Sequence, residues 1–277
     1  HTHTHTHTHG AGVKAILSSI LMCTPRSVLD GNTGTEKRGV RVEKQGFGVF
    51  RLQAELPSSP AQSANDYKLV FSSDEMRAFM ESKCTIAVSI SDGGYDKQPR
   101  SLEVQYFETI LFLEADLAWW GHVVRAAGLS SYNEAERLNG AETIAVTKAE
   151  IPSMIKMRVP RNHIELLENS RQYVAALANA VAGGTYAGRR IATFISLSTD
   201  AMLISKAHEA AARKIMSIDA ARVQPRRDAP MARNVLPVLK CLELHSLRSQ
   251  NNSNVHYEFQ LCRDACVQQL GRKCRRS

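Results

Sequence analysis

The chain has 277 residues, of which 43% are hydrophobic and 22% are charged. This balance is typical of a globular protein and excludes an intrinsically disordered chain. The formal net charge of +8 is unevenly distributed, because residues 151–277 hold 20 Lys and Arg against 9 Asp and Glu. A basic C-terminal half favours anionic partners such as lipid headgroups or nucleic acid. No apolar run reaches the roughly 18–20 uncharged residues that a membrane-spanning helix needs.

The chain begins with HTHTHTHTHG, an alternation typical of a metal-affinity tag or of a translated dinucleotide repeat. We therefore expect residues 1–10 to lie outside the folded part, and we extend this interpretation to 1–21. Residues 24–37 have the composition of a loop. Together these features predict that residues 1–37 are a tag-like or untranslated-type leader followed by a disordered loop.

Residues 38–92 are expected to form a small region that contains strands. Hydrophobic side chains alternate with charged ones at Val40 and Val42, and the alternation continues through GFGVFRLQAEL at 46–56. A turn is expected near residues 44–46, and GFGVF is interpreted as part of a hairpin with a glycine bulge. Further elements are expected in chain order: a loop at 57–66, strands at 66–72 and 84–92, and a helix at 74–83 between these strands.

The segment SLEVQYFETILFLEADLAWWGHVVRAAGL at 101–129 is predicted to form one long amphipathic helix that ends near residue 127. Apolar side chains recur along it at spacings of four and three, which places them on one face. A helix of this kind packs into a bundle or lies in a membrane interface, with tryptophans at the depth of the headgroups. The candidate membrane-interface residues are Tyr106, Ile110, Leu113, Leu117, Trp119, Trp120 and Val124.

Helical periodicity continues to about residue 250. A helix that begins near Asn162 is expected to place Leu166, Tyr173, Leu177 and Val181 on one face. The glycine-rich GGTYAGRR at 183–190 is interpreted as a helix break or a close helix–helix contact, and a final helix is expected over 235–247. The predicted fold class is α+β by chain order: a small β-containing N-terminal part at 38–92, a larger all-helical region of amphipathic helices at 101–250, and a basic, cysteine-containing tail at 251–277.

One family is suggested by these helical segments. ILFLEADLAWWGHVVRAAGL resembles a segment of the peroxisomal and glycosomal membrane-elongation peroxins, the peroxin-eleven family, at Asp116, at Trp119 or Trp120, and at Gly128 and Leu129. RQYVAALANAVAGGTYAGRRIA is similar in character to the next helix of that family. The resemblance covers residues from about 100 to 200. It implies a cofactor-free, non-enzymatic protein that inserts amphipathic helices into one leaflet of the peroxisomal or glycosomal membrane, in membrane elongation or peroxisome fission.

Basic residues give the candidate anion-binding set. They are Arg189, Arg190, Arg272, Lys273, Arg275 and Arg276. An anionic membrane surface is the expected partner, and self-association into a homo-oligomer is a further expectation. The alternative is a protein that binds RNA or a ribonucleoprotein through backbone phosphates.

A second alternative is an enzyme whose site is scattered along the chain. No nucleophile-elbow or zinc-protease motif occurs, so no catalytic residue is predicted. Asp116 and His122 are an acid and a base, but six residues apart on one helix they would point to different faces.

One metal hypothesis concerns the last 37 residues of the chain, 241–277. Cys241 and His245, and likewise Cys262 and Cys266, have a three-residue gap that would place each pair on one helical face. The array matches no zinc-finger pattern, so ordinary thiols are favoured, and zinc binding or a disulfide remains the alternative.

Overall fold

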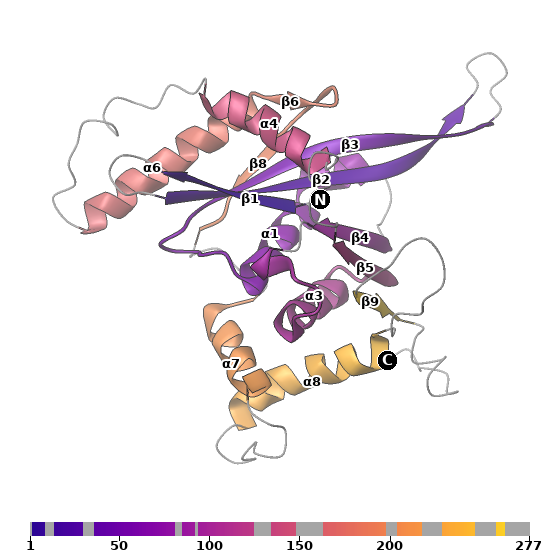
Figure 1. Ribbon diagram of the computed structural model, residues 1–277, viewed down its shortest axis with the longest axis vertical. Coiled ribbons are helices and arrows are strands. Elements are labelled where there is room, and N and C mark those ends of the chain that lie inside the picture. The colour runs from indigo at the N-terminus through magenta and orange to yellow at the C-terminus, as the bar shows by residue number, and fades with distance from the viewer. Residues whose placement is uncertain are drawn as a thin grey trace. The chain divides into compact units, whose positions relative to one another are not determined.

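The computed structural model describes most of the chain, and Figure 1 draws the described elements in colour. The described residues are 2–8, 14–29, 36–80, 85–91, 94–124, 134–147, 163–197, 204–217, 229–246 and 259–263. They form two compact units, each assembled from segments far apart in the sequence. The expected boundary between residues 92 and 101 does not separate the units, because both contain residues from either side of it. The chain contains strands and helices, so the predicted mixed α+β class is confirmed.

Unit 1 consists of His1–Pro57, Asp74–Glu81 and Ser130–Leu197. Its elements are β1 (Thr2–Thr8), β2 (Lys14–Leu29), β3 (Glu36–Leu52), α2 (Asp74–Met80), α4 (Glu134–Thr147), α6 (His163–Ala182), β6 (Thr185–Tyr186), β7 (Arg189–Arg190) and β8 (Ala192–Ile195). Four strands lie in the order β8-β3-β2-β1. β3 and β8 are parallel, and the other neighbours are antiparallel. Helices α4 and α6 pack against these strands around one hydrophobic core.

The start of β2 belongs to this core, which corrects the prediction that residues 1–21 lie outside the fold. Ala15, Leu17 and Leu21 are buried in the cluster that also contains side chains of α4 and α6. Thr2–Thr8 pairs with β2 as a strand, and β2 itself continues through half of the expected loop at 24–37. A strand buried on both faces shows an unbroken apolar run instead of alternation, so AILSSIL is as typical of a core strand as of a leader.

Strand β3 runs from Glu36 to Leu52 without interruption, so the turn predicted near 44–46 is wrong. The glycine bulge is also wrong, because the only irregularity in the β2–β3 register lies at Ser27/Val28. Gly46 and Gly48 instead make room for helix α4. A Cβ at Gly46 would lie 2.5 Å from Leu138 Cδ1, and one at Gly48 would lie 3.1 Å from Glu142 Oε1. The two glycines therefore allow the helix to approach the sheet closely.

The GGTYAGRR segment contains a tight β-hairpin, which corrects the predicted helix break or helix–helix contact. β6 and β7 pair antiparallel on either side of Ala187 and Gly188. The φ angles of these two residues are 51° and 80°. Positive φ at both central positions is typical of a type I′ turn, for which Asn-Gly is the preferred sequence.

Ala187→Asn is expected to raise the free energy of unfolding by about 0.5–1 kcal/mol. Alanine in the left-handed conformation costs roughly 1 kcal/mol, whereas asparagine adopts this conformation more readily. Urea denaturation followed by circular dichroism measures the change. Ala187→Val is the control: its β-branched side chain is disfavoured at positive φ and should destabilise the chain. A loss of stability in the asparagine variant would contradict the assigned turn.

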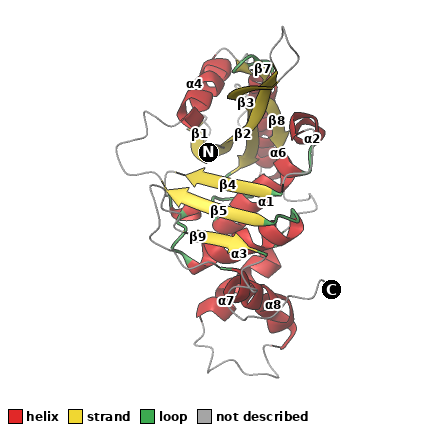
Figure 2. Ribbon diagram, turned by 90° about the vertical axis from the view of Figure 1, so that its right-hand side faces the viewer, coloured by secondary structure: helices red, strands yellow, loops and turns green. Residues whose placement is uncertain are grey.

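Unit 2 consists of Ser58–Ser73, Ser82–Leu129 and Ser198–Ser277. Its elements are α1 (Pro60–Phe71), β4 (Ile86–Ser91), the 3-10 helix η1 (Tyr95–Lys97), α3 (Leu102–Glu114), β5 (Trp119–Val124), α7 (Lys206–Ser217), α8 (Ala229–His245) and β9 (Phe259–Cys262). Figure 2 shows β4, β5 and β9 side by side. β4 is parallel to β5, and β9 is antiparallel to β5. Tyr106 and Phe107 of α3 form a core with side chains of α1, α7 and α8.

Helix α1 replaces the loop and the strand that were predicted over residues 57–72. Ser59 is its N-cap and accepts a hydrogen bond from the backbone N–H of Gln62 at 3.1 Å, and Pro60 lies in the first turn. Both residues are signals of a helix start. Asn65 gives the segment its loop-like composition, but its amide exchanges two hydrogen bonds with the backbone of Ile204, at 2.8 and 3.1 Å. That tertiary contact is not visible in the local sequence.

The predicted helix over 101–127 is correct only in its first half. Helix α3 ends at Glu114, and Trp119–Val124 is strand β5. The backbone N–H groups of Asp116 and Leu117 donate to carbonyls in the last turn, at 3.2 and 3.1 Å, which is a Schellman motif. Asp116 has a φ of 51°, the conformation for which glycine is usually required at this position. Because this position is occupied by aspartate and not by glycine, the usual sequence signal for the end of a helix is missing.

Strands also interrupt the later part of the region predicted to be all-helical, because β6, β7, β8 and β9 lie within or just after it. The helices α6 and α8 of this region lie close to the positions that were predicted for them. In α6, Tyr173, Leu177 and Val181 share one face, as predicted, and they are buried, whereas Leu166 is half-buried. Helix α8 contains most of the final helix expected over 235–247, and strand β4 confirms the one expected over 84–92.

Candidate functional site

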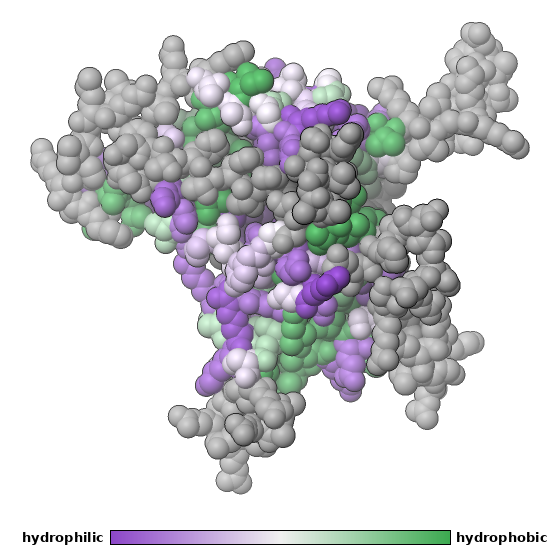
Figure 3. All heavy atoms as spheres, in the orientation of Figure 1, coloured by the Kyte–Doolittle hydropathy of each residue, from purple (hydrophilic) through white to green (hydrophobic). Residues whose placement is uncertain are grey.

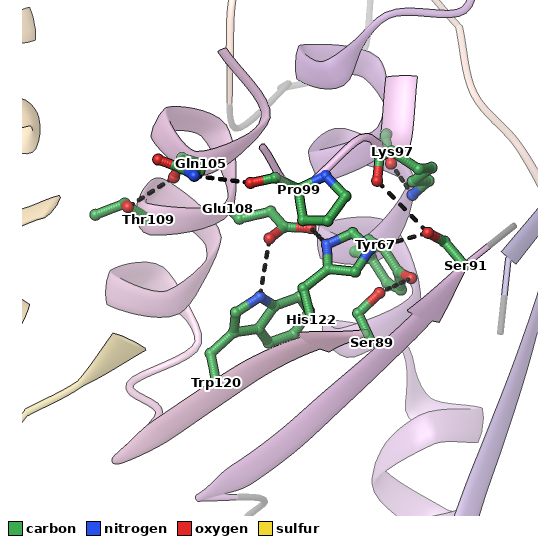
Figure 4. A network of polar contacts seen from close by, with 11 residues as sticks. Tyr67, Ser89, Ser91, Lys97, Pro99, Gln105, Glu108, Thr109, Trp120 and His122 are labelled. Carbon is green, nitrogen blue, oxygen red and sulfur yellow. Dashed lines mark hydrogen bonds and ion pairs between the residues drawn. The ribbon is translucent and has the colours of Figure 1, made fainter. Parts of the chain in front are cut away.

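Four side chains with polar groups lie on one face of the β4–β5 pair in unit 2: Ser89, Ser91, Trp120 and His122. They share a face because alternate residues of a strand point the same way, and Ser89 lies opposite His122 in the parallel register. Helices α1 and α3 contribute hydrogen-bonding partners to this face, through Tyr67 and Glu108. All six side chains are buried. Figure 4 shows this network.

Ser91, His122 and Glu108 form a continuous chain of hydrogen bonds. Ser91 Oγ lies 2.9 Å from His122 Nε2, and His122 Nδ1 lies 2.7 Å from Glu108 Oε1. The three residues come from the C-terminal end of β4, from β5 and from α3. A hydroxyl bonded to one imidazole nitrogen, with a carboxylate on the other nitrogen, is the arrangement that activates a serine nucleophile.

The partners of Glu108 and His122 define the direction of each hydrogen bond. Glu108 Oε2 accepts from the indole N–H of Trp120 at 3.1 Å, which orients the carboxylate toward the imidazole. An ionised carboxylate only accepts, so Nδ1 of His122 carries the proton that it donates to Oε1. In the neutral imidazole, Nε2 is then an acceptor, and the hydroxyl of Ser91 donates to it. This is the tautomer that a general base needs.

Ser91 has a second acceptor nearby, the backbone carbonyl of Lys97 at 3.5 Å. A hydroxyl has one proton and donates it to one acceptor at a time. The distance of 2.9 Å to His122 is the better hydrogen bond, so the proton belongs mainly to the Ser91–His122 pair. The same contact places η1 beside the end of β4.

A second set of polar groups from α1 and η1 lies beside the first. Tyr67 Oη and Ser89 Oγ are 3.1 Å apart. Lys97 Nζ donates to Ser63 Oγ and lies 4.3 Å from the centre of the Tyr67 ring. In Figure 4, Lys97 and Ser91 lie at the same end of the network.

The predicted membrane-interface residues do not form an exposed apolar stripe. Tyr106, Leu117 and Trp120 are each at most 1% exposed, and Leu113 is 41% exposed. Ile110, Trp119 and Val124 are half-buried. Trp119, Trp120 and Val124 belong to strand β5, so they do not share a helical face with the other four residues. In Figure 3, hydrophobic and hydrophilic residues are interspersed on the face shown. The core therefore includes Tyr106, Leu117 and Trp120, three of the side chains that were predicted to contact lipid.

Of the predicted anion-binding set, Arg189 and Arg190 lie on β7 and are exposed. Arg189 Nη2 forms an ion pair with Glu43 Oε2 at 2.9 Å, and its guanidinium lies 5.3 Å from the centre of the Phe79 ring. The backbone carbonyl of Arg190 accepts a hydrogen bond from Gln45 at 2.7 Å. Arg189 therefore links the hairpin to β3 through this ion pair. Its guanidinium is already paired with a carboxylate. The remaining four are outside the described residues: Arg272, Lys273, Arg275 and Arg276.

The predicted zinc ligands are brought together in part. His245 Nδ1 donates to the backbone carbonyl of Cys262 at 3.0 Å, which joins α8 to β9. Cys241 and Cys262 are free thiols, and burial raises the pKa of the Cys241 thiol. Cys266 lies outside the described residues. Across the described ranges, no three His, Cys, Asp or Glu side chains converge to hold a metal ion.

Sequence reasoning missed the Ser91–His122–Glu108 chain, because 31 residues separate Ser91 from His122 and the strand that carries His122 was interpreted as helix. The signal that could have found it is SISDGG, a serine at the end of a strand followed by glycines.

No protein-family model, no curated protein and no solved structure matches this chain. Among the helices of the described residues, none is long and apolar enough to cross a membrane.

Proposed function

We propose that unit 2 is a serine esterase in which Ser91 is the nucleophile, His122 the general base and Glu108 the residue that orients the imidazole. The observation that supports this function is the hydrogen-bond chain itself, with its two distances of 2.9 and 2.7 Å. Its position at the carboxyl end of β4, beside the parallel strand β5, is also where α/β proteins usually bind small ligands.

Catalysis proceeds in two steps. Ser91 Oγ attacks the carbonyl carbon of the ester while His122 Nε2 removes the hydroxyl proton, and Glu108 stabilises the imidazolium that results. When the tetrahedral intermediate collapses, the bond to the alcohol oxygen breaks and the imidazolium returns its proton to that oxygen. In the second step His122 removes a proton from water, the resulting hydroxide attacks the acyl carbon, and the bond between that carbon and Ser91 Oγ breaks to release an acid. Ser91 then recovers its proton from the imidazolium.

Access to Ser91 requires η1 to move. Ser91 and His122 are each 0% exposed, and the carbonyl of Lys97 in η1 lies 3.5 Å from the hydroxyl. A single turn of 3-10 helix is a weak element, and opening of such segments occurs in microseconds to milliseconds. We therefore expect η1 to act as a lid that excludes water once the substrate is bound.

Hydrolysis of p-nitrophenyl acetate by the full chain tests this function. Ser91→Ala and His122→Ala are each expected to lower kcat/KM by about 1,000-fold or more, because both groups act in the same proton transfer. A fluorophosphonate reagent should form an adduct on Ser91, with loss of fluoride, only when His122 is present. Mass spectrometry of the Ser91 peptide detects this adduct.

Ser89→Ala is the matched control, since Ser89 is a buried serine on the same strand and the same face. It should retain activity and labelling of Ser91. Either turnover that survives in Ser91→Ala or the absence of turnover and labelling in the wild type would refute the esterase.

The two functions inferred from sequence stay predictions. Membrane elongation at a peroxisomal or glycosomal membrane is tested by flotation of the full chain with vesicles that contain anionic lipid. Binding to RNA is tested by a gel-shift titration at two salt concentrations, because phosphate contacts weaken as salt rises. Tyr106, Leu117 and Trp120, three of the seven residues proposed for a membrane interface, are buried in the described part of the chain.

A further inference from the structure

Lys97 is a buried cation beside the proposed nucleophile. Its side chain is 5% exposed, and its ammonium donates to the hydroxyl of Ser63. The same ammonium lies 4.3 Å from the centre of the Tyr67 ring. Ser63 and Tyr67 are four residues apart on α1, so one face of this helix provides both contacts. Within the part of the chain that the structure describes, no carboxylate lies within ion-pair distance of Lys97 Nζ.

A buried ammonium without a counter-charge is unfavourable. Removing a charge from water is costly unless an opposite charge compensates it, and lysine is rarely buried unless it is paired. One hydroxyl and one aromatic ring compensate only part of this cost. The arrangement is therefore suited to an anionic group that arrives with a ligand and supplies the missing charge.

We propose that Lys97 and Ser63 bind an anionic group of the substrate, so that the enzyme acts on esters whose acyl chain ends in a carboxylate or a phosphate. The anion site and the nucleophile are neighbours, because the backbone carbonyl of Lys97 lies 3.5 Å from Ser91 Oγ. Lys97 belongs to η1, so binding of the anion also favours closure of this lid over the ester. This inference rests on the esterase function proposed for Ser91.

The test compares two substrates, p-nitrophenyl acetate and the mono-p-nitrophenyl ester of succinic acid, which carries a free carboxylate. Lys97→Met is expected to raise KM for the succinate ester by about 10- to 100-fold, the value of a charge-assisted hydrogen bond. The readout is the ratio of the two KM values, because the acetate has no anionic group for Lys97 to bind and its KM should change less than that of the succinate ester. Lys68→Met is the matched control, because Lys68 is a partly exposed lysine of α1 that pairs with Glu114.

A second measurement does not depend on catalysis. Inorganic phosphate should raise the midpoint of thermal unfolding of the wild type and of Lys68→Met, but not of Lys97→Met, because a ligand stabilises the state that binds it. Fluorescence of the two tryptophans, both in unit 2, follows the unfolding.

The outcomes separate the two proposals. A phosphate effect that requires Lys97, in a chain without esterase activity, would leave the anion site standing and refute the esterase. Esterase activity with equal changes in KM for both substrates in Lys97→Met, or with no effect of phosphate on the wild type, would overturn the anion site and leave the esterase standing.

Discussion

Trp120→Ala is expected to lower the free energy of unfolding of unit 2 by about 3–5 kcal/mol, the usual cost of removing a large buried aromatic side chain. Trp120 is 1% exposed, and its ring forms a T-shaped pair with that of Tyr67 at a centroid distance of 6.1 Å. Its indole N–H is a donor to Glu108. The substitution would therefore leave a cavity and also remove a hydrogen bond from a buried carboxylate.

Trp119→Ala is the matched control from the adjacent position. Trp119 points to the other side of β5 and is half-buried, so its loss should cost roughly 1 kcal/mol or less. Each single variant retains one tryptophan, and its fluorescence follows urea denaturation of unit 2. Small and equal effects would contradict the core position of Trp120, and are the result expected if both tryptophans lay at a membrane interface.

The elements that were predicted correctly are those whose signals are local. Helix α6 repeats Tyr173, Leu177 and Val181 at the spacing of one helical face, as predicted, and the structure buries these three side chains. Strand β4 follows from a short run of β-branched residues that ends before glycines. In both elements the local sequence and the tertiary packing favour the same conformation.

The errors occurred where a tertiary contact overrides the local signal. Asn65 has a turn-forming side chain but lies within helix α1, because its amide bonds to the backbone of Ile204. Strand β5 contains an aromatic and β-branched run, but the absence of glycine at Asp116 concealed the end of the preceding helix. Gly46 and Gly48 looked like a bulge, and their role is visible only once α4 lies against them.

The candidate site could not be predicted for a related reason. Its three residues come from three elements, and each is unremarkable in its own segment. A histidine in a predicted amphipathic helix gives no indication that it lies opposite Ser89 in a parallel sheet. Glu108 is a polar residue among the apolar positions of 101–129, and nothing in its segment indicates that it accepts hydrogen bonds from both Trp120 and His122. Only the register of β4 against β5 brings these groups together.

Glu142→Gln is expected to stabilise unit 1 at high pH. Glu142 of α4 is buried against β2, where Oε2 accepts a hydrogen bond from Ser19, and Oε1 has no hydrogen-bond partner among the described residues. Burial raises the pKa of this carboxyl from 4.5 to about 8. The folded chain therefore keeps a proton that the unfolded chain releases at lower pH.

The sign of the pH dependence follows from this difference. Between about pH 4.5 and pH 8 only the folded state binds the proton, so the free energy of unfolding falls as pH rises, by about 1.4 kcal/mol per pH unit from this group. Below that range both states are protonated, and this group causes no loss of stability. Above it the folded state holds a buried carboxylate, and the loss of stability from this group is complete. Glutamine has no proton to release and should remove this slope.

Urea denaturation followed by circular dichroism at about pH 5 and about pH 9 measures the effect. The Glu142→Gln variant should gain on the order of a few kcal/mol over the wild type at the higher pH, with a much smaller difference at the lower pH. Hydrogen exchange in peptides of β2 and α4 assigns the gain to unit 1, because both tryptophans lie in unit 2. Glu136→Gln, on the same helix and half-buried, should follow the wild type. A constant difference between Glu142→Gln and the wild type at both pH values would mean that the Glu142 carboxyl is already ionised in the folded chain.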